Sequence, residues 1–122
     1  MQLQDLKSQL TLVFPVRIDC EERRENLRVV LRQLDGLGCR MLVLEADAVP
    51  ALGEEAWPDG VEYTFVEDAS KVFHRTRYIN ELLRMAGTEV VGVWDTDVLV
   101  GYAQIGEAVQ RILEGWTFAY SY

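Results

Sequence analysis

The chain has 122 residues, a length that fits one domain with a single modest core. Hydrophobic residues make up 49% of it and charged residues 26%, which is the balance of a folded globular protein. The 20 acidic and 12 basic residues give a formal net charge of −8. This charge argues against general binding to nucleic acid or to an anionic membrane, but it allows a local cationic pocket for one phosphate group.

No segment approaches the roughly 20 apolar residues that a membrane-spanning helix needs, and the first residues lack the basic and apolar regions of a signal peptide. Two cysteines, Cys20 and Cys39, are too few for a disulfide scaffold. The expected elements place them at opposite edges of a parallel sheet, beyond disulfide reach. We therefore expect a reduced, cytoplasmic protein without a transmembrane segment.

Apolar runs alternate with helical patterns along the chain. The run over residues 11–18 predicts a strand buried on both faces. Asp19 and Glu22 then have the spacing of a capping box at a helix start. The helix that follows presents one apolar stripe, formed by Leu27, Val30, Leu31 and Leu34.

The middle of the chain continues the alternation. Residues 41–44 predict a second buried strand, residues 48–60 a loop rich in proline and glycine, and residues 61–66 a third strand nearer the sheet edge. A second helix ends at Gly87, and we expect its inward face to consist of Ile79, Leu82, Leu83 and Ala86.

The last third of the chain adds a fourth strand over residues 90–94, a third helix and a fifth strand over residues 116–122. The inward positions of that helix are Ile105, Ala108, Val109 and Ile112. The β-α-β-α-β order predicts one α/β domain over residues 1–122, with an open, mostly parallel, Rossmann-like sheet and helices on both faces.

Ligands of such sheets bind beyond the carboxyl ends of the strands. Polar side chains follow the strands at those ends, namely Arg17, Asp19, Glu45, Asp47, Glu67, Asp68, Asp95 and Asp97. Asp95 and Asp97 can share a hard divalent cation that also holds a diphosphate. The alternative is a pair of solvated acids in a turn between strand and helix.

Arginines open the second helix. Arg75 and Arg77 combine side-chain charge with the free N–H groups of a helix start, which suits a phosphate. The alternative is that they pair with Glu67, Asp68 or Glu81.

The first two strands also end in charged residues. Arg17 interrupts an apolar strand at its end, and Asp19 either caps the next helix or contacts a ligand. Glu45 holds the equivalent place on the second strand, where an acid often receives a ribose hydroxyl or a base N–H. A solvated loop acid is the alternative there.

Three short motifs stand at this edge: Pro15-Val16-Arg17, Trp94-Asp95-Thr96-Asp97 and Phe73-His74-Arg75-Thr76-Arg77-Tyr78-Ile79-Asn80. Together with the strand–helix order, they resemble the nucleotide-sugar-binding half of a GT-A glycosyltransferase. The resemblance is to the β-1,4-galactosyltransferase type and to related bacterial capsule or polysaccharide glycosyltransferases, and it extends over most of residues 11–122.

The resemblance implies a metal-dependent hexosyltransferase whose donor is a nucleotide-diphosphate sugar, a UDP-sugar first of all, and whose acceptor is a glycan in polysaccharide or capsule biosynthesis. Asp95 would meet the ribose or the metal, and Asp97 would coordinate Mn²⁺ or Mg²⁺. The other implied contacts are Pro15, Arg17 and Asp19 with the nucleotide, and Phe73 and Arg75 with the uridine and diphosphate.

Members of this group place the acceptor site, the general base and a further metal ligand after the fifth strand, whereas this chain stops at Tyr122. We therefore expect a truncated piece of a glycosyltransferase domain, with exposed apolar surface that favours self-association. A haloacid-dehalogenase-type phosphatase would need its Asp motif on the first strand, and a phospho-receiver domain would need a late lysine. The remaining alternative is a non-catalytic nucleotide- or partner-binding α/β module.

Overall fold

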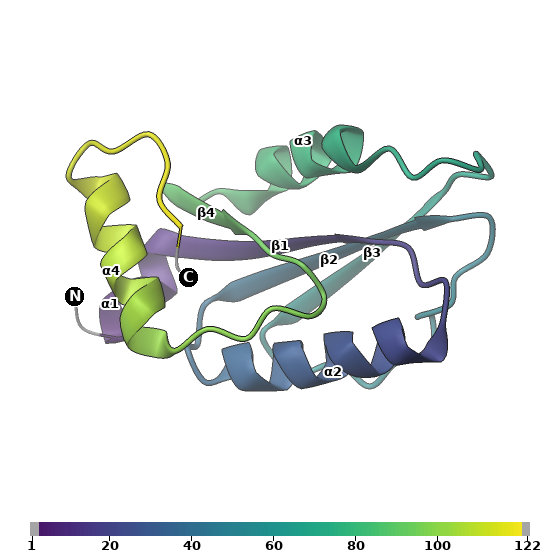
Figure 1. The fold of residues 1–122 in the computed structure, drawn as a ribbon, viewed down its shortest axis with the longest axis horizontal. Helices are drawn as coiled ribbons and strands as arrows, with labels where there is room; N and C mark the ends of the chain where they lie inside the picture. The colour runs from purple at the N-terminus through teal and green to yellow at the C-terminus, as the bar shows by residue number, and fades with distance from the viewer. Residues whose placement is uncertain (1–2, 121–122) are drawn as a thin grey trace.

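The computed structural model describes residues 3–120 and forms a three-layer α/β domain. Four parallel strands make one open sheet in the order β3-β2-β1-β4, with α2 against one face and α3 against the other (Figure 1). This confirms the predicted fold class. The elements are α1 (Leu3–Gln9), β1 (Leu10–Val16), α2 (Glu21–Asp35), β2 (Arg40–Asp47), β3 (Val61–Glu67), α3 (Arg75–Ala86), β4 (Val90–Val93) and α4 (Tyr102–Leu113).

The two central strands are buried on both faces, and their side chains alternate between two cores. Toward α2, the strands contribute Leu12, Phe14, Val16, Met41 and Val43. Toward α3, they contribute Val13, Leu42, Leu44 and Ala46. This arrangement explains why both strands have near-continuous apolar sequences. It also means that the face on which any polar residue of β1 or β2 lies is set by the parity of its number.

The β2–β3 crossover has no helix, and residues 48–60 instead pack beside α2. Arg24 Nη1 donates to the Ala51 carbonyl at 2.7 Å, and the Arg28 guanidinium pairs with Glu55. The hydrogen bond from Arg28 lowers the pKa of the Glu55 carboxyl. These contacts let an irregular segment cover the sheet face that a crossover helix usually covers.

The strand order reverses at β1. The strands β2 and β3 lie on one side of β1, and β4 lies on the other side. The last β4 contact is from the Trp94 N–H to the Val13 carbonyl, at 3.0 Å. Along a strand, the backbone groups of every second residue point to the same neighbouring strand. The backbone of Pro15 therefore points to the β4 side, as that of Val13 does, but at a level past the end of β4. Its missing N–H therefore costs no ladder hydrogen bond, and the two strands part there.

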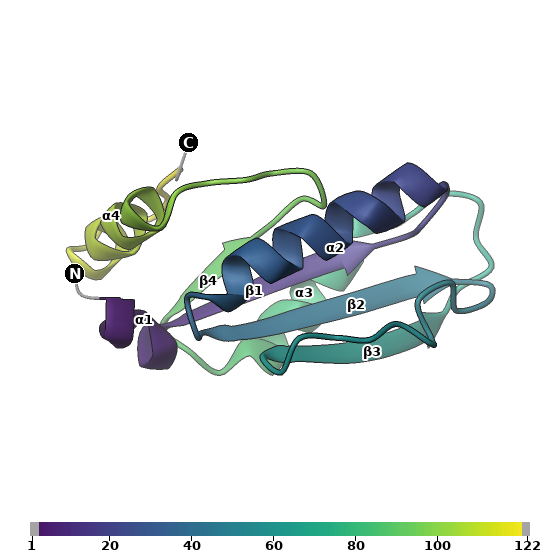
Figure 2. The same cartoon turned by 90° about the horizontal axis from the view of Figure 1, so that it is seen from below.

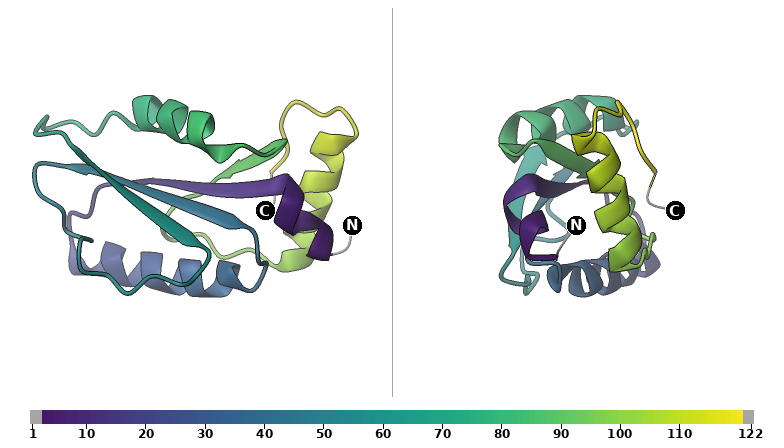
Figure 3. Two further views of the ribbon diagram at one scale, coloured as in Figure 1. Left: turned by 180° about the vertical axis from the view of Figure 1, so that it is seen from behind. Right: turned by 90° about the vertical axis from the view of Figure 1, so that its left-hand side faces the viewer.

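The helices α1 and α4 pack together at the amino ends of the strands (Figures 2 and 3). Leu6, Ile105 and Val109 join the core on the α2 side. The helix α1 was not predicted from the sequence. None of the helices within residues 3–120 is long and apolar enough to cross a membrane.

The last predicted strand and the predicted inward face of the second helix were wrong. Residues 116–120 pair with no strand, and β4 stays an edge strand; residues 121 and 122 of that predicted strand lie outside the described part of the chain. On α3, the buried residues are Tyr78, Leu82 and Ala86, whereas Leu83 is 45% exposed. The buried face is therefore turned by about one residue from the predicted one.

Candidate functional site

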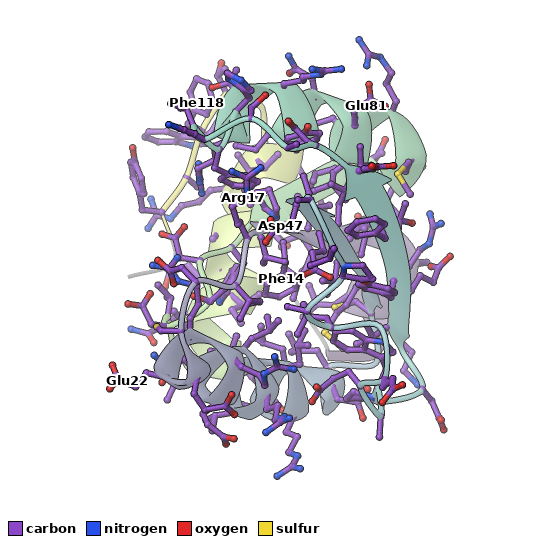
Figure 4. All side chains as sticks on the ribbon, turned by 90° about the vertical axis from the view of Figure 1, so that its right-hand side faces the viewer. Phe14, Arg17, Glu22, Asp47, Glu81 and Phe118 are labelled. Carbon is purple, nitrogen blue, oxygen red and sulfur yellow. The ribbon has the colours of Figure 1, made fainter. Side chains whose placement is uncertain are left out.

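A cavity of about 610 Å³ opens at the carboxyl ends of β1 and β4, where the strand order reverses. This is the position at which open α/β sheets bind ligands. Figure 4 looks onto this end of the sheet, with Arg17 and Asp47 between the two helix layers and Glu22 on α2. Of the residues predicted from sequence, the cavity brings together Pro15, Arg17, Asp19, Phe73, Arg75, Asp95 and Asp97.

Trp94 fixes the segment that carries the two aspartates. Its indole is buried. Its backbone N–H donates to the Val13 carbonyl, and its side-chain Nε1 donates to the Val98 carbonyl at 3.0 Å. The backbone contact anchors the segment to β1, and the side-chain contact closes the turn that carries Asp95 and Asp97. Both carboxylates are exposed, and a tryptophan with its polar atom satisfied gives them a rigid base.

Arg75 is the first residue of α3, and it reaches across the cavity to the end of β4. Its Nη2 lies 2.9 Å from Asp95 Oδ1. Arg77 lies elsewhere, with its guanidinium 5.7 Å from the centre of the Tyr78 ring, and it does not line the cavity. Of the two arginines predicted to meet phosphate, the structure therefore places only Arg75 in the cavity.

Arg17 has a structural task that the sequence did not indicate. Its Nε donates to the Ala46 carbonyl at 2.8 Å, Nη1 to Ser70 at 2.7 Å and Nη2 to Asp68 at 3.1 Å. The guanidinium also lies 5.5 Å from the centre of the Phe73 ring. Arg17 thus ties the end of β2 to the loop before α3, and two of its five N–H groups are left for a ligand.

Asp68 holds the same loop from its other side. Its carboxylate accepts hydrogen bonds from the Tyr78 hydroxyl and from the Ser70 N–H, the latter at 2.9 Å. The Tyr78 hydrogen bond, with the Ser70 contacts, holds the pKa of Asp68 far below its usual range. The Phe73 ring stacks on Tyr78 with centroids 5.7 Å apart, so the end of this loop is fixed directly before Arg75 at the start of α3.

Asp19 does not cap α2, contrary to the capping-box prediction. The N-cap residue is Cys20, and no side chain makes a cap hydrogen bond there. Asp19 pairs instead with Arg23 Nε at 3.0 Å. A hydrogen bond from Cys20, with the charge of Arg23, lowers the pKa of the Asp19 carboxyl. Asp19 therefore stays in the cavity wall as a paired carboxylate.

Glu45 lies outside the cavity, and its predicted place at a ligand is corrected. It shares the α2-side face with Met41 and Val43, is fully buried, and accepts hydrogen bonds from the Ala51 N–H, the Leu52 N–H and the Tyr63 hydroxyl. Burial and the hydrogen bond to Glu45 raise the pKa of the Tyr63 hydroxyl. Glu45 organises the loop over residues 48–60.

The cavity wall also contains residues that were not predicted as ligands from the sequence, namely Cys20, Glu22, Arg23, Asn26, Lys71 and Thr96. They come from the first turns of α2, from the loop before α3 and from the turn between the two aspartates. Arg23 looks like one charge of a solvated helix face, and only the fold shows that this turn borders the cavity. No sequence signal short of the fold could have selected it.

Within residues 3–120 there is no group of three or more His, Cys, Asp or Glu side chains with metal-site geometry. Asp95 and Asp97 are the cavity carboxylates that follow one another on a single turn, and no side chain of the described residues pairs with Asp97. Two carboxylates fit a Mg²⁺-type ion that takes its other ligands from water and from substrate phosphates. They do not form a closed protein cage for a metal.

Both cysteines are free thiols, as predicted, with Cys20 exposed at the cavity and Cys39 buried. No family model, curated protein or solved structure matches the chain. What the chain does must therefore be inferred from the chemistry of this cavity.

Proposed function

We propose that the chain binds a nucleotide-diphosphate sugar together with Mn²⁺ or Mg²⁺ in the cavity at the ends of β1 and β4. In this proposal it is the donor-binding part of a cytoplasmic, metal-dependent glycosyltransferase. The observation that carries it is the meeting of Arg75, Asp95 and Asp97 at the point where the strand order reverses. A cationic side chain can donate hydrogen bonds to a diphosphate, and two carboxylates can bind the divalent cation that accompanies it.

Each of these side chains has one role in the proposal. Asp97 and Asp95 would hold the cation, and a bound divalent cation would supply positive charge to offset the charge of a leaving nucleoside diphosphate. Arg75 binds a phosphate oxygen from the other side of the cavity. Arg17 and Asp68 keep the loop with Phe73 in place, so that this ring can border the nucleoside.

The transfer itself would break the bond between sugar C1 and the diphosphate oxygen and form a bond from an acceptor hydroxyl to C1. The hydroxyl proton has to pass to a general base, and we assign no residue of this chain to that role. The acceptor proposed from the resemblance is a glycan of a polysaccharide or capsule pathway. The donor proposed first is a UDP-sugar.

The second candidate is a nucleotide-binding module without catalysis. It is favoured by the pairing of two cavity carboxylates, Asp19 with Arg23 and Asp95 with Arg75, which leaves few groups to accept a proton. The two candidates differ in one measurement. Release of UDP from a UDP-sugar in the presence of glycan acceptors supports the transferase, and metal-dependent binding without release supports the module.

The experiment for donor binding is a calorimetric titration of UDP and GDP with and without Mn²⁺, on wild type and on Asp97→Asn. We expect Mn²⁺-dependent binding of UDP that weakens at least about tenfold in the variant, since a metal ligand is lost. Asp59→Asn is the matched control, because Asp59 is exposed and lies in the turn before β3, outside the cavity. Binding that ignores both Mn²⁺ and Asp97→Asn, or no binding at all, would overturn the proposal.

We also propose that the isolated chain self-associates through apolar surface at its last segment. Trp116, Phe118 and Tyr120 are 59%, 81% and 83% exposed. Light scattering across a concentration series should show a mass above that of a monomer, and Phe118→Ser should lower it. A monomer at every concentration contradicts this.

A further inference from the structure

An ion pair joins Arg75 and Asp95 across the cavity. In the proposed function these two side chains have separate partners, the diphosphate for Arg75 and the cation for Asp95. Arg75 starts α3, Asp95 follows β4, and the Nη2 and Oδ1 atoms are 2.9 Å apart. Both side chains line the same cavity and remain about half exposed, 47% and 56%. The pair is therefore accessible to solvent ions, and no burial prevents it from opening.

A bound cation and a bound diphosphate make opposite demands on this pair. The cation needs the Asp95 carboxylate, while the diphosphate needs the Arg75 guanidinium. In the structure each of these groups neutralises the other. A cation that binds alone must compete with a guanidinium for Asp95, and an anion that binds alone must compete with a carboxylate for Arg75.

Two neighbouring arginines of the cavity wall are already engaged in other contacts. Arg17 already donates to three backbone carbonyls, and Arg23 is engaged with Asp19. Asp97 lies on the same turn as Asp95 and has no partner among the described side chains. Opening the Arg75–Asp95 pair is thus the step that frees one anionic and one cationic group together.

We propose that this ion pair is an electrostatic latch that makes cation and nucleoside diphosphate bind cooperatively, an inference that rests on the proposed function. Either ligand opens the latch and exposes the group that the other needs. By linkage, the gain in affinity is the same in both directions. An exposed ion pair contributes little free energy, so the closed latch should lower the affinity for either ligand alone by only about twofold to fivefold.

The first test measures Mn²⁺ alone, by the loss of the free Mn²⁺ signal in electron paramagnetic resonance. Arg75→Gln removes the competitor for Asp95, so it should bind Mn²⁺ about twofold to fivefold more tightly than wild type. Arg77→Gln removes the same charge from the same helix turn outside the cavity, and it should change little. Equal gains in both variants, or no gain in Arg75→Gln, would overturn the latch.

The reciprocal test titrates UDP in the presence of a chelator. Asp95→Asn frees Arg75 and should bind metal-free UDP more tightly than wild type, whereas Asp97→Asn removes an equal charge that pairs with no arginine and should gain less. Equal gains in the two variants mean general repulsion and contradict the latch.

Failure of the proposed function is read separately, from wild-type binding of UDP with Mn²⁺ present. If that binding occurs and Arg75→Gln gains no Mn²⁺ affinity, only the latch is wrong. If neither wild type nor Arg75→Gln binds Mn²⁺ and wild type binds no UDP, both are wrong.

Discussion

Replacing Glu45 should destabilise the protein without weakening nucleotide binding. Its Oε1 accepts from the Leu52 N–H at 3.2 Å and from the Tyr63 hydroxyl at 2.6 Å, and its Oε2 accepts from the Ala51 N–H at 2.9 Å. In Glu45→Gln the amide oxygen can keep the first two bonds, but the NH₂ group then faces the Ala51 N–H. One lost acceptor at a buried site costs about 1–3 kcal/mol.

Glu45→Ala should cost more, because it leaves all three donors without their acceptor and opens a cavity under the loop. We expect about 3–5 kcal/mol, because each of three buried donors left without an acceptor costs about 1–3 kcal/mol, while the variant no longer has to bury a carboxylate. Total stabilities of such domains are about 5–15 kcal/mol, so the variant should still fold at low temperature.

Urea unfolding followed by tryptophan fluorescence measures these costs. Trp57 stacks on Tyr63 with centroids 5.2 Å apart, so its emission reports on the region that Glu45 organises. Glu62→Gln is the matched control, because Glu62 is exposed on β3 and pairs only with Arg40 at the surface; it should cost less than about 1 kcal/mol. Normal stability with tenfold weaker UDP binding in Glu45→Gln would refute the structural role and restore Glu45 as a ligand.

Three further outcomes follow from local environments. Ellman's reagent should label Cys20 in the folded protein and Cys39 only on unfolding, and UDP with Mn²⁺ should slow labelling of Cys20 because it lines the cavity; unchanged labelling would place the ligand elsewhere. Burial raises the pKa of the Cys39 thiol to about 11 from an ordinary 9.0, so the unfolded state loses this proton first. Between those pH values wild type should therefore lose about 2 kcal/mol of unfolding free energy relative to Cys39→Ala, measured by urea unfolding, and parallel pH profiles would contradict it. Gly92→Ala should destabilise by about 1–3 kcal/mol because its Cβ would lie 2.8 Å from a buried Leu12 methyl group, whereas Gly106→Ala in α4 meets nothing within 4 Å and should stabilise by up to about 1 kcal/mol; thermal unfolding with the opposite order would reject this account.

The architecture was predictable where burial leaves a strong pattern. The strands β1 and β2 are covered on both faces, so their apolar runs are nearly continuous, and the stripe on α2 from Leu27 to Leu34 covers about two turns. The helix α1 has seven residues, too few for a period to stand out. The aromatic alternation over residues 116–120 resembles a strand, but a strand needs a neighbour, and only the fold shows that none pairs with it.

The candidate site was predictable to the extent that it follows from strand ends. Asp95 and Asp97 could be placed because β4 ends directly before them. Glu45 was misplaced because the loop over residues 48–60 covers it: its carboxylate accepts hydrogen bonds from the Ala51 and Leu52 N–H groups of that loop, and the cavity at the ends of β1 and β4 lies elsewhere. The task of Arg17 depends on three carbonyls from two other segments, and no local pattern encodes those contacts.

The charges around the cavity also bear on the choice between a metal–diphosphate complex and a bare anion. The chain has 20 acidic and 12 basic residues, yet the cavity wall has as many basic as acidic side chains: Arg17, Arg23, Lys71 and Arg75 against Asp19, Glu22, Asp95 and Asp97. The wall is therefore less negative than the rest of the protein, but two of its arginines are already paired with its own acids. A diphosphate alone would meet little net attraction there and long-range repulsion from the rest of the chain. A divalent cation on Asp97 would supply the missing positive charge, and this makes metal-dependent binding the outcome that the electrostatics favour.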